Sequence, residues 1–316
     1  MIKKQLLIYM MIFMLIFAVS CQQSEVEKTG SPSNTVAPSP TAAVIENTKI
    51  MDDFYAMADD NMILQELLVF IDENISKVSE QQASMMIGKF ESIQKNQLFM
   101  IEAQFFGDNT IQSRMSEIYQ RQFLITDIYE SEDPDIKALT ASMLETGYKV
   151  ETSEGSFFPV VDYSFYKKYS DYLTDEYKEY IDIMAVETDS PAAKDAGLYI
   201  TYADILDRLL SQEAYISTYS DSPRLDVMRQ QYARYVYFLL YGADNTPAFF
   251  YESHMMNDDA KTIYTTVLSN TTDSNVAVIM APYIAILERN NFTLTDEVVS
   301  ERGKVQIELL IAAGIE

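Results

Sequence analysis

Apolar residues recur every three or four positions along most of the chain beyond residue 48. Between Ile50 and Val78 they include Met51, Phe54, Met57, Leu64, Leu67, Leu68, Ile71 and Ile75. This spacing places them on one face of an α-helix. The same pattern continues from Ser79 to Phe105 and from Ile111 to Ile128. We therefore expect residues 48–147 to form an antiparallel helical bundle.

Helix start signals divide this first region. Ser79 followed by Gln82 three residues later is the capping-box pattern. The stretch GDNT at 107–110 interrupts the periodicity. Asp133 and Pro134 follow as an N-cap and a first-turn proline, which predicts a further helix from that point.

Residues 148–161 depart from the helical pattern. Tyr148–Thr152 and Ser156–Val161 are predicted as two short strands, and Gly155 supplies the positive φ that their turn needs. Pro159 has no amide hydrogen, so the second strand should lie at an edge. An isolated hairpin is marginally stable in water and must pack on helices. We interpret it first as a joint between two helical halves and second as the lip of a ligand cleft.

Helical spacing resumes after the hairpin. The expected helices cover residues 162–170, 174–189, 201–218, 223–241, 258–270, 275–290 and 296–313. Thr201 with Asp204, and Ser222 with Pro223, are start signals, whereas Pro282 should kink its helix or begin a new one. The fold class is therefore all-α, a helical bundle in two packed halves, 48–147 and 148–316, with one short β-hairpin between them. A solenoid-like arrangement of helix pairs stays open.

The non-helical stretch GADNTPAFFYE at 242–252 interrupts the second half. Asn245, Thr246 and Pro247 predict a turn. The aromatic residues that follow it are interpreted as clamping the turn onto the bundle.

The first 23 residues read MIKKQLLIYMMIFMLIFAVSCQQ. Lys3 and Lys4 form a short positive region, a fourteen-residue apolar run extends from Leu6 to Val19, and small Ser20 precedes Cys21. This is the architecture of a secretory signal peptide. The run is shorter than the roughly 20 apolar residues of a spanning helix.

The segment resembles a bacterial lipoprotein signal, whose box here reads Ala18-Val19-Ser20-Cys21. Cys21 is the only cysteine of the chain, and secreted proteins normally contain cysteines in pairs. The resemblance implies that residues 1–20 are removed and that Cys21 carries a diacylglyceryl thioether. The protein is then expected on the extracytoplasmic face of the cell membrane, anchored through lipid. The alternative is an ordinary secretory signal with an accidental cysteine.

Residues 21–47 follow as the expected linker. They are rich in Ser, Pro, Thr and Ala and contain no aromatic residue. Such a composition cannot bury enough apolar surface to offset the entropy of ordering. We predict a disordered spacer between the lipidated cysteine and the folded part.

The strongly acidic charge limits the partners. The formal net charge is −25, and it becomes −27 once Lys3 and Lys4 leave with the signal. Binding to nucleic acid depends on basic residues, so we expect no nucleic-acid partner. A cation, a basic peptide, a neutral glycan or another envelope protein fits better. Alternatively, the acidity only keeps the protein soluble.

Familiar catalytic motifs do not occur in the sequence. His254 is the only histidine, no thiol remains after lipidation, and the nine glycines form no phosphate loop. The acidic stretches DDFYAMADD, ESEDPD, ETDSP and NDD lack the spacing of a calcium loop and are interpreted as solvated helix ends. We therefore expect no cofactor and no metal site.

One group of residues is predicted to bind a ligand. Glu187 and Asp189 lie in the last turn of the helix expected at 174–189, where the helix dipole disfavours anions. Together with Asp162, Tyr163 and Tyr166 they could line a polar cleft at the junction of the halves. The expected function is a non-enzymatic binding or interaction module at the cell envelope. The alternative is an envelope glycan hydrolase that uses paired carboxylates.

Overall fold

The computed structural model describes residues 42–58, 63–107 and 109–315. The predicted signal peptide, Cys21 and the linker up to residue 41 lie outside this range. Residues 42–47, which the sequence analysis assigns to the linker, belong to the first helix. No helix within the described ranges is long and apolar enough to cross a membrane.

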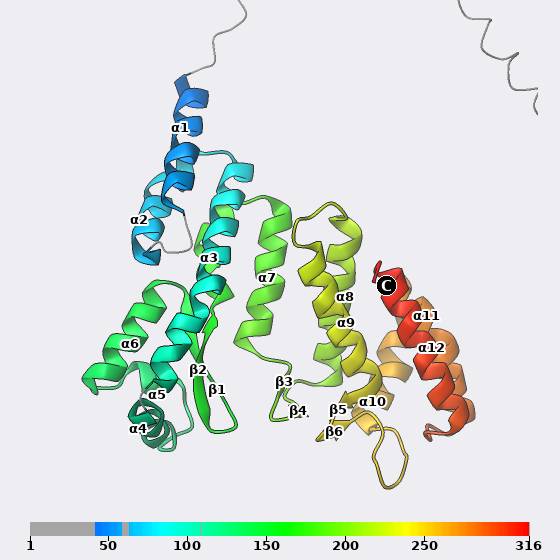
Figure 1. Ribbon diagram of the computed structural model, residues 1–316. Helices are drawn as coiled ribbons and strands as arrows, with labels where there is room; N and C mark the ends of the chain where they lie inside the picture. The colour runs from blue at the N-terminus through cyan, green and yellow to red at the C-terminus, as the bar shows by residue number, and fades with distance from the viewer. Residues whose placement is uncertain (1–41, 59–62, 108, 316) are drawn as a thin grey trace, which may run out of the picture. The chain divides into compact units, whose positions relative to one another are not determined.

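Helices make up most of the described structure, which confirms the all-α class (Figure 1). The α-helices are α1 (Ala42–Met57), α2 (Leu64–Asn74), α3 (Glu80–Phe106), α4 (Asn109–Tyr119), α5 (Thr126–Tyr129), α6 (Pro134–Glu145), α7 (Asp175–Asp189), α8 (Tyr202–Thr218), α9 (Leu225–Tyr241), α10 (Asp258–Thr262), α11 (Asn275–Arg289) and α12 (Asp296–Ala312). Tighter or wider turns form η1 (Ile75–Lys77), η2 (Tyr163–Tyr172), the π-helical η3 (Ile263–Val267) and η4 (Leu268–Asn270).

Three of the four predicted helix starts are present, whereas α9 begins at Leu225, after Ser222 and Pro223, and its N-cap Arg224 forms no side-chain cap. Ser79 and Gln82 form the capping box of α3, in which each side chain accepts a hydrogen bond from the other residue's backbone amide. Thr201 and Asp204 do the same for α8. Asp133 accepts two backbone amide hydrogen bonds at the start of α6. These bonds satisfy donors that have no partner inside the helix.

Several helices differ from the expectation: the one expected from Ile111 to Ile128 is divided into α4 and α5, and the segment expected as a helix at 162–170 forms the 3₁₀-helix η2. The periodic stretch from Ile50 to Val78 is divided, since α1 ends at Met57 and α2 begins at Leu64. Pro282 neither ends nor begins a helix, because α11 continues through it. The proline removes the hydrogen bond to the carbonyl of Val278. Val278 is 65% exposed, so water can reach that turn.

The predicted hairpin is confirmed. Strands β1 (Tyr148–Ser153) and β2 (Ser156–Val161) pair antiparallel from Tyr148 opposite Val161 to Ser153 opposite Ser156. Gly155 has a φ of +77° in the turn. The hairpin buries Tyr148, Val150, Phe157 and Val161, and β2 packs against α3.

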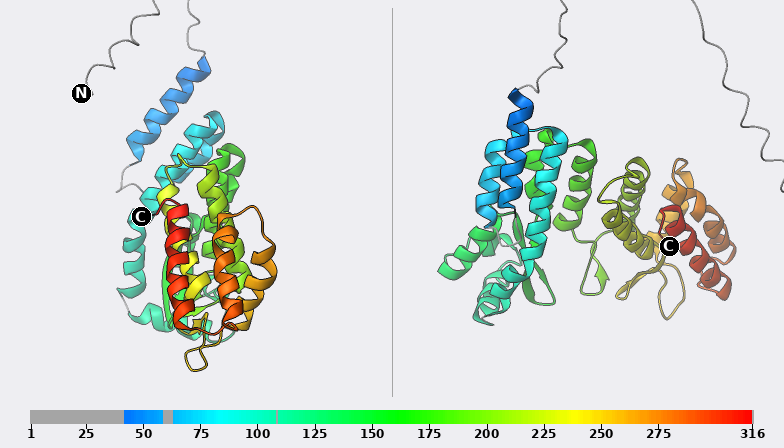
Figure 2. Two further views of the ribbon diagram at one scale, coloured as in Figure 1. Left: turned by 90° about the vertical axis from the view of Figure 1, so that its right-hand side faces the viewer. Right: turned by 45° about the horizontal axis from the view of Figure 1, so that its top comes forward.

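Two shorter hairpins were not predicted as strands. They are β3 (Ala193–Lys194) with β4 (Gly197–Leu198), and β5 (Gly242–Ala243) with β6 (Thr246–Pro247). With two residue pairs each, they are too short for an alternating pattern to appear in the sequence. The second contains the turn predicted at Asn245. All three hairpins lie along the same edge of the helices (Figure 1, Figure 2).

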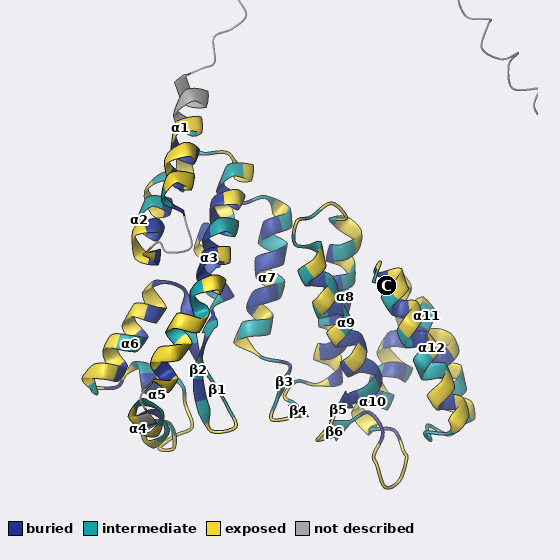
Figure 3. Ribbon diagram, viewed as in Figure 1, coloured by how far each residue is buried: buried dark blue, intermediate teal, exposed yellow. Residues whose placement is uncertain are grey.

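The buried residues form two clusters within the compact unit of residues 42–316 (Figure 3). The first core cluster contains residues from Met51 to Ala185, together with Tyr215 and Met228. The second core cluster extends from Ala192 to Ala313. The β1–β2 hairpin packs inside the first cluster, which Tyr215 and Met228 of α8 and α9 complete.

Candidate functional site

Asp162 and Asp189 are brought together by Lys149. The Nζ atom of Lys149 lies 3.5 Å from Asp162 Oδ1 and 2.5 Å from Asp189 Oδ1, and the Ser164 hydroxyl donates to Asp189 at 2.7 Å. Partial burial alone would raise the pKa of Asp189, but the hydrogen bonds from Lys149 and Ser164 lower it on balance. Lys149 therefore supplies the positive charge that offsets an anion at the end of α7.

The other three predicted residues do not join this pair. The Tyr163 hydroxyl donates to Glu91 at 2.6 Å, and the Tyr166 hydroxyl donates to the Gln94 side chain. Both rings are buried in the first core cluster, and burial raises the pKa of both hydroxyls. Neither ring presents a face to solvent, so the cleft expected from the sequence is not assembled around them.

Glu187 points to a different neighbourhood. Its carboxylate accepts a hydrogen bond from the Tyr235 hydroxyl at 2.6 Å and lies 3.5 Å from Arg208 Nη1. Arg208 also donates to the carbonyl of Ser190 at 2.9 Å. This partly buried pair lines a pocket of about 280 Å³ between α7 and α8. The polar atoms of Glu187 and Arg208 already have hydrogen-bond partners within the protein. The pair therefore fits a role in holding α7 and α8 together.

Glu91 is a buried carboxylate that the sequence analysis missed. Its oxygen atoms accept hydrogen bonds from Tyr163 at 2.6 Å, from Tyr177 and Tyr180 at 2.8 Å each, and from Lys95 at 2.6 Å. Burial by itself would raise the pKa of Glu91, but the charge of Lys95 and the donated hydrogen bonds lower it. The group therefore stays ionised at neutral pH and is unsuited to serve as a general acid.

A groove of about 570 Å³ opens above Glu91 between α3 and the start of α9. Arg224 stacks on the Tyr177 ring, 3.4 Å from its centroid, and pairs with Glu176 at 3.0 Å. Gly88 leaves room for this stacking, since a Cβ there would lie 3.1 Å from the guanidinium. The two cations that line the groove, Lys95 and Arg224, are thus paired with Glu91 and Glu176. This pairing favours a role for the two cations in joining helices.

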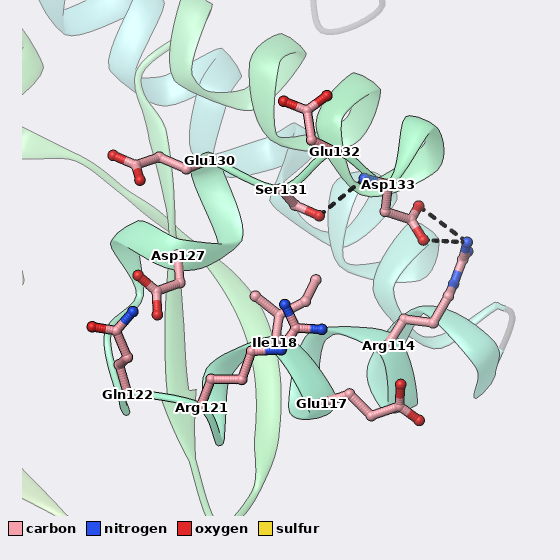
Figure 4. Close-up of a pocket in the computed structure, with 10 residues that line it drawn as sticks. All are labelled: Arg114, Glu117, Ile118, Arg121, Gln122, Asp127, Glu130, Ser131, Glu132 and Asp133. Carbon is pink, nitrogen blue, oxygen red and sulfur yellow. Dashed lines mark hydrogen bonds and ion pairs between the residues drawn. The ribbon is translucent and has the colours of Figure 1, made fainter.

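The pocket in Figure 4 holds many charges but no buried acid. It has a volume of about 530 Å³, and Arg114 on one side donates to Asp133 and Asp135. The carboxylates of Glu117 and Glu132 are exposed to solvent. Among the described residues, no group of three or more His, Cys, Asp or Glu side chains is arranged to hold a metal ion.

A further pocket lies where the turn of the β1–β2 hairpin meets the end of α4 and the β3–β4 turn. We call it the turn pocket, and its volume is about 280 Å³. Its lining comprises Ser116, Tyr119, Gln120, Phe123, Thr152, Ser153, Glu154, Gly155, Phe157, Lys194, Asp195 and Tyr199. The residues come from three separate parts of the chain, so only the folded protein contains it.

Hydrogen bonds fix the turns around this pocket. The Asp195 carboxylate accepts from the Ser153 hydroxyl at 2.7 Å and from the Glu154 amide at 2.8 Å. The side chain of Asn245 donates to the Asp195 carbonyl at 2.7 Å, and its backbone amide donates to the Ala196 carbonyl at 2.8 Å. The turns of all three hairpins are therefore linked through one aspartate.

Two exposed aromatic rings stand at the turn pocket. Phe123 is 67% exposed and Tyr199 is 64% exposed. Phe123 adopts a left-handed conformation with a φ of +59°, which is uncommon for a bulky residue. Its amide donates to the Tyr119 carbonyl at 2.7 Å, and the Tyr119 ring packs edge-on against it with centroids 5.6 Å apart. Backbone strain that presents an apolar ring to solvent is more typical of recognition than of packing.

The sequence contained little signal for this pocket. Phe123 looks like one more apolar position in a helical pattern, yet α4 has already ended at Tyr119. No family model, curated protein or solved structure matches the chain. The functional argument therefore depends on the geometry of the site.

Proposed function

We propose that the protein is a lipid-anchored, non-enzymatic binding module on the outer face of the cell membrane, and that the turn pocket is its binding site. The observation that supports the site is the strained, exposed Phe123 beside Tyr199, above polar groups held by Asp195. Apolar walls with a few fixed polar groups are the usual composition of a ligand pocket. The lipoprotein-like segment ending at Cys21 supports the anchor.

The buried carboxylates favour binding over hydrolysis. A glycan hydrolase of the paired-carboxylate type needs two facing carboxyl groups roughly 5–9.5 Å apart, one of them able to hold a proton. Glu91 is held ionised by its partners, and Glu187 is paired with Arg208. Glu154 at the turn pocket is exposed to solvent. These environments do not supply the protonated acid that the alternative function requires.

The binding site can be tested by replacing Phe123 with glycine. Glycine adopts the left-handed conformation without strain, so the variant should fold at least as well as the native protein. The full chain in detergent would be screened by thermal shift against divalent cations, cell-wall fragments and basic peptides. A ligand at about 100 times its Kd should stabilise the native protein by roughly 2.7 kcal/mol.

That stabilisation should disappear in Phe123→Gly and persist in Phe99→Ala, which removes an equally exposed ring from α3. Equal losses in the two variants, or a response that survives in Phe123→Gly, would place the binding site elsewhere.

The anchor can be tested separately with Cys21→Ser. Loss of the thiol removes the acceptor of the lipid, so the variant should leave the membrane fraction or stay unprocessed. Ser24→Ala, three residues away, is the matched control and should behave as the native protein. Full membrane retention of Cys21→Ser with the signal segment removed, as judged by mass after detergent-free washing, would argue against lipidation.

A further inference from the structure

We infer that the turn pocket is one end of a longer site for an extended, positively charged polypeptide segment, which lies along the three hairpin turns from Phe123 to Tyr251. This inference rests on the proposed function and specifies its ligand. We call the surface formed by Phe123, Tyr199, Tyr251 with its neighbour Glu252, and the three turns the turn row.

The turn row is a continuous surface. Besides the bonds made by Asp195, the amide of Leu198 donates to the Thr246 hydroxyl at 2.7 Å, which joins β4 to β6. The Tyr251 hydroxyl donates to the carbonyl of Asp244 at 3.1 Å and so holds this ring at the third turn. Figures 1 and 2 show the three hairpins side by side on one edge.

Aromatic rings are repeated along this surface. Phe123 and Tyr199 flank the first and second turns, and Tyr251, at the third, is 70% exposed. A cavity of about 280 Å³ accommodates one small group only. Rings at successive turns therefore suit a ligand that carries repeated groups along an extended chain, and not a single compact molecule.

The charge of the turn row selects a cationic ligand. Glu154, Asp244 and Glu252 are exposed, and none of the three carboxylates forms an ion pair with a cation in the part of the chain that the structure describes. The pocket's own cation, Lys194, is held by Glu151 at 2.6 Å. Arginine and lysine side chains bind both to aromatic faces and to carboxylates. A neutral glycan would stack on the rings and donate hydroxyl hydrogen bonds to the carboxylates, but it would leave their negative charge uncompensated.

The net charge of the protein also favours a positively charged ligand. A chain with a formal charge of −25 attracts basic polypeptides over long range. The attraction exerted by the charge of the whole protein does not locate the binding site. A test must therefore separate it from the attraction exerted by the carboxylates of the turn row. The turn row and the pocket of Figure 4 both carry exposed carboxylates, and they can be compared directly.

The experiment measures binding of a fluorescent 12-residue peptide of alternating arginine and serine to the full chain in nonionic detergent. The test variant Glu154→Gln/Asp244→Asn/Glu252→Gln removes three charges from the turn row. The control variant Glu117→Gln/Asp127→Asn/Glu132→Gln removes three charges from the pocket of Figure 4. We expect the affinity to fall at least tenfold in the test variant and less than twofold in the control.

Ligand length provides a second criterion. Tyr251→Ser should weaken the 12-residue peptide severalfold and leave the dipeptide Arg-Ser unaffected, because only the long ligand reaches the third turn. Equal losses in the two triple variants would show that the attraction is not local and would overturn the inference. Absence of peptide binding would overturn it as well.

A third probe separates this inference from the proposed function. A neutral hexamer of N-acetylglucosamine is the probe. If Phe123→Gly abolishes its binding and the triple charge variant of the turn row does not, the proposed binding function is supported. The inference of a cationic ligand is then wrong. If neither probe binds and the thermal-shift screen is also flat, both proposals fail.

Discussion

The carboxylate of Asp195 accepts a hydrogen bond from the hydroxyl of Ser153 at 2.7 Å, although 42 residues separate them in the chain. It also accepts from the Glu154 amide. We predict that Asp195→Ala increases the hydrogen-exchange rate of that amide and lowers the free energy of unfolding by about 1 kcal/mol. Asp195→Asn keeps an acceptor and tolerates the φ of +49°, so it should protect the amide nearly as well. Unchanged exchange in Asp195→Ala would contradict the linkage of the turns.

Glu91 should make stability depend on pH in the acidic range. Its pKa in the folded protein lies below the ordinary 4.5, so the unfolded chain binds more protons than the folded one in the window below 4.5. The stabilisation is fully present above that pH and is lost as the pH falls through the folded-state pKa. Urea unfolding of the native protein and Glu91→Gln at pH 7 and pH 3.5 would measure this contribution.

At pH 7 we expect Glu91→Gln to lower the free energy of unfolding by at least about 2 kcal/mol, because a buried charge-assisted network is broken. The difference from the native protein should shrink at pH 3.5. Glu102→Gln changes an exposed residue on the same helix and should leave the pH dependence as it is. A pH-independent difference for Glu91→Gln would contradict the lowered pKa.

Two buried glutamines should respond in opposite directions to replacement by methionine. Gln212 is fully buried, and neither its side-chain oxygen nor its nitrogen has a hydrogen-bond partner among the described residues. An unpaired buried polar group costs about 1–3 kcal/mol. Gln212→Met should therefore raise the free energy of unfolding, by about 1 kcal/mol or more, in a urea titration.

Gln94 is equally buried but donates to the carbonyls of Thr146 and Gly147 at 2.8 and 2.7 Å. Gln94→Met leaves both carbonyls without this donor and should destabilise the protein by about 2 kcal/mol or more. If both variants were destabilised alike, an ordered water must satisfy Gln212.

Two glycines with similar φ values should differ in their tolerance of alanine. Gly242 combines a φ of +75° with a ψ of −146°, a region that is essentially restricted to glycine, and a Cβ there would lie 2.3 Å from the Thr246 carbonyl oxygen. Gly155 has a φ of +77° but nothing within 4 Å of such a Cβ. We expect Gly242→Ala to cost more than about 3 kcal/mol and Gly155→Ala about 1 kcal/mol. Comparable melting temperatures would contradict the close approach at Gly242.

Local signals made most of the fold predictable. The capping boxes at Ser79 and Thr201 and the turn at Gly155 depend on residues close in sequence, and all three are present as expected. The break between α1 and α2 was missed because apolar periodicity continues on both sides of it. The short strands of β3 to β6 were missed because two residue pairs leave no pattern.

The candidate site was less predictable because tertiary contacts decide which side chains meet. Tyr163 and Asp162 are neighbours in sequence, yet one faces the core carboxylate Glu91 and the other faces Lys149. The buried position of Glu91 could have been predicted, because Glu91 follows Ile87 by one helical turn on the apolar face of α3. A charged residue at a core position implies buried partners, but the sequence does not say that three of them are tyrosines.

The composition of the first core cluster also has a consequence for the order in which the protein can fold. Its apolar residues lie mostly before Ala185, but Tyr215 and Met228 complete it from α8 and α9. Chains are synthesised from the N-terminus and domains generally fold as units. A chain that emerges N-terminus first therefore cannot complete the first core cluster until Met228 has emerged, when much of the second core cluster is still to follow.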